Sequence, residues 1–87
     1  GLPESEGFYD IRIFQGLTSG RRIRLDFISD SPSETSICVY DIRGIQRFRT
    51  ITDDNTFEFS LDGLLPGIYI LTVVSDGKEW VKKIMIY

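Results

Sequence analysis

Residues 61–87 read LDGLLPGIYILTVVSDGKEWVKKIMIY. Two runs rich in β-branched and aliphatic residues, 68–74 and 80–86, stand on either side of Asp76-Gly77. An Asp-Gly pair between two such runs predicts a β-hairpin, because both residues tolerate the positive φ that a type I′ turn requires. Pro66 and Gly67 mark a turn before the first run. The stretch therefore predicts two antiparallel strands.

Most of the remaining sequence alternates between apolar and polar residues with a period of two. Three runs, around Ile11, Leu25 and Phe59, each predict a strand with one face on a core and one face in water. Residues 37–42 and 68–74 are apolar on both faces, which predicts central strands that are covered on both sides or carry part of a partner surface. Residues 45–51 bear arginines on one face and predict an edge or exposed strand.

These elements predict an all-β protein. Seven short strands joined by turns, with no sustained helical period, indicate an immunoglobulin-like antiparallel β-sandwich. A chain of 87 residues is too short for a second core. We therefore expect a flexible N-terminal segment at residues 1–7 and a single β-sandwich domain at residues 8–87.

Composition argues against several functional classes. Ten basic and thirteen acidic residues are scattered along the chain, a balance that argues against a nucleic-acid partner. The chain has no histidine and one cysteine, which excludes the usual metal sites and the Ser-His and Cys-His nucleophiles. No apolar run approaches the ~20 residues of a transmembrane segment. We expect no enzyme activity, catalytic residue, metal or cofactor, and we expect Cys38 to be a buried small hydrophobic residue.

Four motifs share their order and spacing with a known family. They are Thr18-Ser19-Gly20 before a strand, Tyr40-Asp41-Ile42-Arg43-Gly44, Leu64-Leu65-Pro66-Gly67-Ile68-Tyr69, and Lys82-Lys83-Ile84-Met85-Ile86. With them, residues 13–87 resemble the C-terminal sorting domain of cargo proteins of the type IX secretion system of Bacteroidetes. The family's Pro-Asn-Pro motif is missing, so the chain resembles a divergent member.

The resemblance implies a function and a location. It implies a non-catalytic sorting domain that directs an N-terminal cargo domain across the bacterial outer membrane, with the type IX secretion machinery as partner. The protein would pass through the periplasm and be secreted or held at the cell surface, and its signal peptide would lie upstream of this segment. The resemblance also implies a set of residues for recognition by the translocon: Gly67, Tyr69, Lys82, Lys83, Ile84 and Ile86.

Each of these residues also has an explanation within the fold, and Ile84 and Ile86 are expected to face the core because they alternate along the last strand. Gly67 stands where the backbone reverses, and Tyr69 would point inward with its hydroxyl on a turn carbonyl. Lys82 and Lys83 face opposite sides of their strand, so one of them would lie at the sheet margin, where an edge-strand lysine hinders unwanted pairing. We also expect that residues 45–51 or 80–87 could pair with a partner strand or with a second copy. The alternative function is a generic immunoglobulin-like binding or spacer module of a secreted Bacteroidetes protein.

Overall fold

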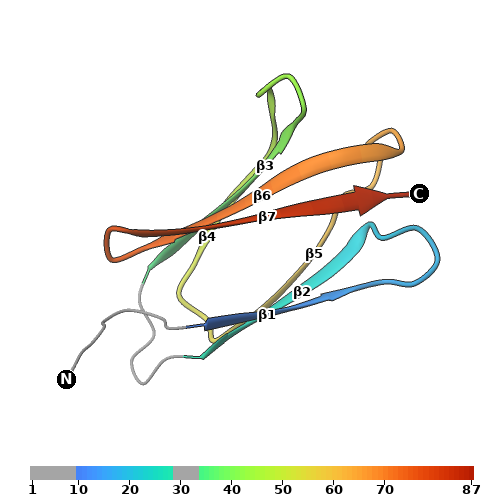
Figure 1. The fold of residues 1–87 in the computed structure, drawn as a ribbon. Helices are drawn as coiled ribbons and strands as arrows, with labels where there is room; N and C mark the ends of the chain where they lie inside the picture. Colours follow the sequence, from blue (N-terminus) through green and yellow to red (C-terminus); the bar gives the residue numbers. More distant parts are fainter. Residues whose placement is uncertain (1–9, 29–33) are drawn as a thin grey trace.

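The computed structural model describes residues 10–28 and 34–87, whose strands form two antiparallel sheets (Figure 1). The strands are β1 (Asp10–Gln15), β2 (Arg22–Ile28), β3 (Thr35–Asp41), β4 (Gln46–Thr52), β5 (Thr56–Ser60), β6 (Gly67–Ser75) and β7 (Lys78–Ile86). One sheet has the order β1-β2-β5 and the other has the order β4-β3-β6-β7. The described residues form no helix. The predicted seven-stranded, all-β sandwich is confirmed.

The core lies between the two sheets and is built from every second residue of the strands. Ile23 and Leu25 of β2 are fully buried, whereas Arg24 between them is exposed. Phe48 of β4 and Phe59 of β5 stack across the sandwich with ring centroids 4.6 Å apart. Each fully buried aliphatic side chain stabilises the fold by about 1.5–3 kcal/mol. The period-two pattern thus supplies one continuous core shared by both sheets.

The two strands that were expected to be central occupy the middle of the four-stranded sheet. β3 pairs with β4 and β6, and β6 pairs with β3 and β7. Their inward residues are buried, and the outward residues Ile68 and Val74 of β6 are partly exposed. The strand over residues 46–52 lies at the edge of this sheet, as its arginines predict, and β7 lies at the opposite edge.

The turns at the two ends of this sheet have distinct local causes. Asp76 and Gly77 have φ of 51° and 76°, as the Asp-Gly hairpin prediction requires. In the β3–β4 turn the Asp41 carboxylate accepts hydrogen bonds from Arg43 N at 2.9 Å and Ile45 N at 3.0 Å. Desolvation raises the pKa of Asp41, but these bonds and that from Arg47 lower the pKa overall. The carboxylate form that closes the turn is thereby favoured.

Some expectations fall outside the described residues. They concern the flexible segment at residues 1–7, the first residues of the strand expected around Ile11, and the turn at residues 30–33. Cys38 lies within the described part and is buried, as predicted.

Candidate functional site: the terminal strand and the loop that holds it

β7 is an edge strand, paired with β6 on one side. Its residues Ile84 and Ile86 face the core and are buried. Met85 between them faces outward, opposite Ile68 of β6. The second half of β7 therefore has one face that builds the core and one face that is accessible from outside.

Lys82 and Lys83 are both exposed, on opposite faces of β7. Lys82 lies opposite Leu71 and so shares the inward face, and Lys83 lies opposite Ile70 on the outward face. Lys82 is exposed because it stands on the outermost strand, at the sheet margin expected for one of the two lysines. A lysine that points inward from an edge strand hinders the addition of another strand at that position.

The end of β7 is hydrogen-bonded to the β1–β2 loop, residues 16–21. The side-chain amide of Gln15 donates from Nε2 to Met85 O at 3.0 Å and to Gly20 O at 2.9 Å. Tyr87 N donates to Ser19 O at 2.8 Å. These bonds join the terminal strand to the three-stranded sheet, so the strand is fixed by both halves of the sandwich.

Arg21 links three segments at the same end of the molecule. Its Nη1 donates to Tyr87 O at 3.2 Å, and its Nη2 donates to Leu64 O at 2.6 Å. Arg21 O also accepts from Leu61 N at 2.9 Å. One guanidinium therefore holds the β5–β6 loop, the β1–β2 loop and the end of the chain together.

Gly20 is required by a close approach of two backbone segments. Its φ is +78°, and a Cβ at this position would stand 2.6 Å from Met85 O and 2.9 Å from Gln15 Nε2. Real Cβ atoms do not come so close to a carbonyl oxygen. The β1–β2 loop can thus lie against β7 only because residue 20 has no side chain.

The hydrogen-bonding groups of β7 alternate between its two sides. Met85 O bonds Gln15, so this carbonyl turns away from β6. Because the ladder of an antiparallel pair alternates, the backbone groups of Glu79, Val81 and Lys83 turn away from β6 in the same way. The loop contacts with Gln15 and Ser19 occur beyond these residues. Among the described residues, the stretch around Lys82 and Lys83 is therefore an open sheet edge.

The structure divides the residues that the resemblance implied for recognition. Tyr69, Ile84 and Ile86 are buried, and Gly67 begins β6 opposite Ile86. The Tyr69 hydroxyl donates to Leu65 O at 2.6 Å, which is the turn carbonyl bond expected from the sequence. Three of the six residues therefore pack inside the sandwich, whereas the two lysines lie on its surface.

Replacing the Tyr69 hydroxyl is expected to have a small effect. Tyr69→Phe keeps the buried ring and removes the bond to Leu65 O, so the free energy of unfolding should fall by about 0.5–1.5 kcal/mol. Urea denaturation measures this loss. Tyr87→Phe is the matched control, because the Tyr87 side chain is 69% exposed and should change stability by much less. An equal loss in both variants would contradict the role of the hydroxyl.

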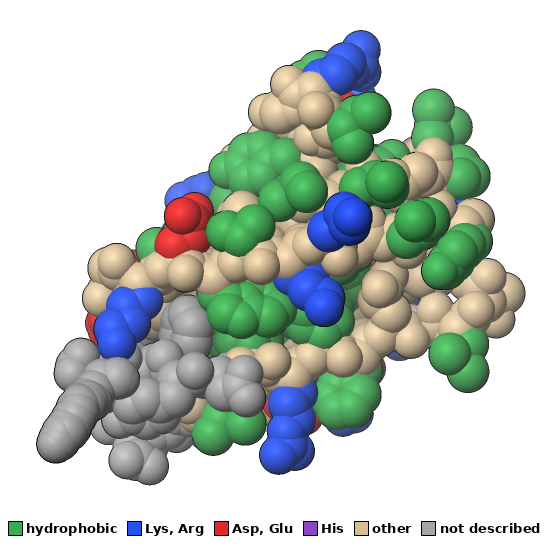
Figure 2. All heavy atoms as spheres, in the orientation of Figure 1, with side chains coloured by type: hydrophobic (Ala, Val, Ile, Leu, Met, Phe, Trp, Pro, Cys, Tyr) green, Lys and Arg blue, Asp and Glu red, His purple; other side chains and the backbone are tan. Residues whose placement is uncertain are grey.

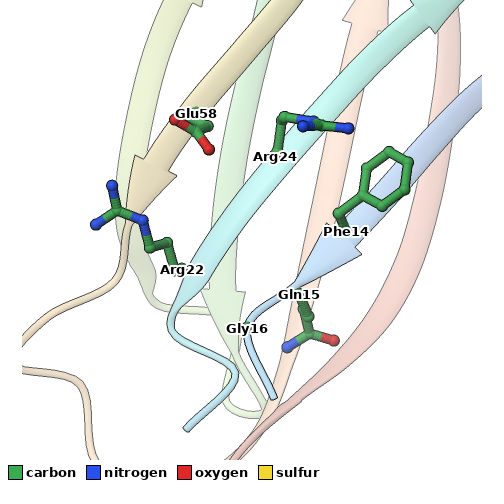
Figure 3. Close-up of a pocket in the computed structure, with 6 residues that line it drawn as sticks. All are labelled: Phe14, Gln15, Gly16, Arg22, Arg24 and Glu58. Atoms are coloured by element: carbon green, nitrogen blue, oxygen red, sulfur yellow. The ribbon is translucent and has the colours of Figure 1, made fainter. Parts of the chain in front are cut away.

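A hollow of about 240 Å³ opens on the outward face of the three-stranded sheet (Figure 3). Arg24 stacks over the Phe14 ring at 4.3 Å, and its Nε lies 3.3 Å from Asp26. Arg22 and Glu58 also line the hollow. Charges of both signs alternate here, as on a solvated strand face. In the part of the chain that the structure describes, no three potential metal ligands gather, and no helix could span a membrane.

The residues that hold β7 in place were not predicted from the sequence. Thr18-Ser19-Gly20 was identified only as a motif before a strand, with no partner assigned to it, and no role was predicted for Gln15 or Arg21. The available signal was the glycine that ends this motif, since a glycine required at positive φ often marks a close backbone approach. The bonds of Gln15 to Met85 and of Arg21 to Leu64 and Tyr87 carry no local signal, because they join residues 43 to 70 positions apart in the sequence.

Comparison with known proteins bears on the same part of the chain. The family described as "secretion system C-terminal sorting domain" matches residues 19–87. This match begins within the β1–β2 loop and includes Gly20, Arg21 and the whole of β7. No curated protein sequence matches the chain.

Proposed function

Because the chain belongs to the family of secretion-system C-terminal sorting domains, we propose that the open edge of β7, with Lys82 and Lys83, is what the export machinery contacts. The domain is a sorting signal for type IX secretion, and it directs its protein across the outer membrane to a secreted or cell-surface location. Beyond this sorting function, we propose that the contact with the export machinery is made through β7. One observation carries this proposal: Lys82 and Lys83 are the exposed members of the implied recognition set, and they lie on a strand edge whose end is hydrogen-bonded to Gln15 and Ser19.

The two kinds of residue in that set have different roles in this proposal. Ile84, Ile86, Tyr69 and Gly67 act indirectly, because they build the sandwich that presents β7. Lys82 and Lys83 act directly, by pairing with carboxylates of the machinery at the exposed surface of β7. The folded domain, rather than a short linear peptide, is then the unit that is recognised.

The domain is proposed to be non-catalytic and to act on a cargo domain that precedes it. The chain has no histidine, and its adjacent carboxylates Asp53 and Asp54 are exposed in a turn after β4. The hollows around β1 and β2 are shallow and open rather than enclosed pockets for a substrate. Self-association through the edges of β4 and β7 remains a prediction, which the inward Lys82 disfavours at its own position.

Exchanging both lysines tests the contact without disturbing the fold. Lys82→Gln with Lys83→Gln should leave the free energy of unfolding within about 1 kcal/mol, because exposed charges contribute little. Export of a reporter fused before the domain should fall roughly five- to tenfold, because two charge-assisted contacts are lost. The measurement is the surface and extracellular fraction of the reporter in a type IX-competent bacterium.

A charge-matched control separates this contact from net charge. Arg12→Gln with Arg22→Gln removes the same two positive charges from exposed positions of β1 and β2, on the other sheet. This variant should be exported normally. Undiminished export of the lysine variant would reject contact through β7, and equal losses in the two variants would assign the effect to overall charge.

A further inference from the structure

Large apolar side chains protrude around the end of β7. Leu17 is 99% exposed, Leu65 is 77% exposed and Tyr87 is 69% exposed, and Ile68 and Met85 are partly exposed. We call these five residues the terminal patch. Figure 2 shows hydrophobic side chains at the end of the molecule that carries the C-terminus in Figure 1. Leu17, Leu65 and Tyr87 are too exposed to contribute much to the core, so the fold alone does not explain them.

The five residues are brought together by the contacts that hold β7. Ile68 and Met85 are cross-strand neighbours on the outward face. Leu17 and Tyr87 line one hollow of about 400 Å³, together with Gln15 and Gly20. Leu65 is held in position by two hydrogen bonds. Its own carbonyl accepts a bond from the Tyr69 hydroxyl, and the carbonyl of the neighbouring Leu64 accepts one from Arg21. The patch therefore spans the β1–β2 loop, the β5–β6 loop and the terminal strand.

The opposite end of the sandwich differs in character. Its described turns consist of the exposed polar residues Asp53, Asp54 and Asn55 after β4, and Asp76-Gly77 after β6. Of the four large apolar residues of the described chain that are more than about 60% exposed, three are Leu17, Leu65 and Tyr87 of the patch, and the fourth is Ile42 in the β3–β4 turn. Such strong exposure of neighbouring apolar residues indicates a surface that is buried against something else.

We propose that the terminal patch docks end-on to a protein of the export machinery that offers an apolar surface bordered by carboxylates. This rests on the proposed function. The patch is continuous with the β7 edge, since Lys83 precedes Met85 by two residues on the same face. Lys82 and Lys83 adjoin the patch on a chain of net charge −3, so the local charge complements an acidic border.

The shape of the patch favours a protein over a lipid surface as the occupant. The hollow between Leu17 and Tyr87 is concave and partly polar, because Gln15 and Thr18 also line it. A protruding side chain of a protein can fill such a hollow, whereas a bilayer surface cannot follow it. The central anchors of the interface would be Leu17 and Tyr87, with Leu65 and Met85 beside them.

A double substitution tests the patch. Leu17→Thr with Leu65→Thr changes two exposed loop residues, so the free energy of unfolding should change by no more than about 0.5 kcal/mol. Export of a fused reporter should fall about tenfold or more, because two apolar contacts are lost. The matched control is Ile51→Thr with Val74→Thr, which alters two partly exposed residues on the outward face of the same sheet, away from the patch. The control variant should be exported like the unaltered protein.

The outcomes separate this proposal from the sorting function itself. Deleting residues 10–87 abolishes export if the domain is the signal. If that deletion abolishes export but the Leu17/Leu65 variant is exported normally, the patch proposal is wrong and the sorting function stands. A second measurement tests whether the terminal patch binds lipid instead of a protein. The 87-residue chain should not bind phosphatidylcholine/phosphatidylglycerol vesicles in a flotation assay. If the unaltered chain binds vesicles and the Leu17/Leu65 variant does not, the patch binds lipid, and the proposal of a protein partner is wrong.

Discussion

Removing residues 82–87 is expected to abolish both the stability of the domain and the export of its protein. The deletion takes away Ile84 and Ile86, each of which stabilises the fold by about 1.5–3 kcal/mol through burial. It also removes the acceptors of Gln15 and Arg21 at Met85 and Tyr87. Since small domains are stable by only about 5–15 kcal/mol in total, these losses should leave little folded protein.

Two measurements and two further variants separate loss of folding from loss of the export signal. Thermal unfolding monitored by circular dichroism measures the fold, and surface delivery of a fused reporter measures the signal. Ile84→Ala with Ile86→Ala removes core packing and keeps the exposed face of β7, whereas the lysine variant does the reverse. If the chain lacking residues 82–87 is still exported at the normal level, β7 is not needed for sorting and the proposed contact is wrong.

Gly20→Ala is expected to destabilise the domain by about 2–5 kcal/mol. The positive φ at this position costs about 1–2 kcal/mol for a residue with a side chain. The new Cβ would stand 2.6 Å from Met85 O, and moving backbone atoms apart in a packed region costs about 1–3 kcal/mol more. The end of β7 should therefore separate from the β1–β2 loop, which amide hydrogen exchange at Tyr87 would detect.

Gly44→Ala provides the matched control for this prediction. Gly44 has a similar φ of +86°, but a Cβ there would meet no atom within 4 Å. The free energy of unfolding of the Gly44→Ala variant should therefore fall by only about 1–2 kcal/mol, which is the cost of a positive φ for a residue with a side chain. The difference between the two variants, measured by urea denaturation, reports the contact between the β1–β2 loop and β7. Equal losses would mean that this contact is not tight in solution.

The strands and most turns were predictable from local patterns. The alternation of Ile23, Leu25 and polar residues defines a half-buried strand without knowledge of its partner, because successive side chains of any strand face opposite sides. The Asp76-Gly77 turn was predictable because its backbone conformation depends on those two residues alone. The family was recognisable for a related reason, since its motifs are short and follow one another in order along the chain.

The candidate site was only partly predictable. The sequence determined that the chain is an all-β sandwich, that β3 and β6 are central, and that Tyr69 points inward to a turn carbonyl. The sequence also predicted that Ile84 and Ile86 face the core. Only the tertiary structure decided that Lys82 is exposed on the inward face and that Leu17, Leu65 and Tyr87 lie at one end. These properties depend on contacts such as that between Gln15 and Met85, which are 70 positions apart, and no local pattern encodes which distant backbone atoms a side chain will reach.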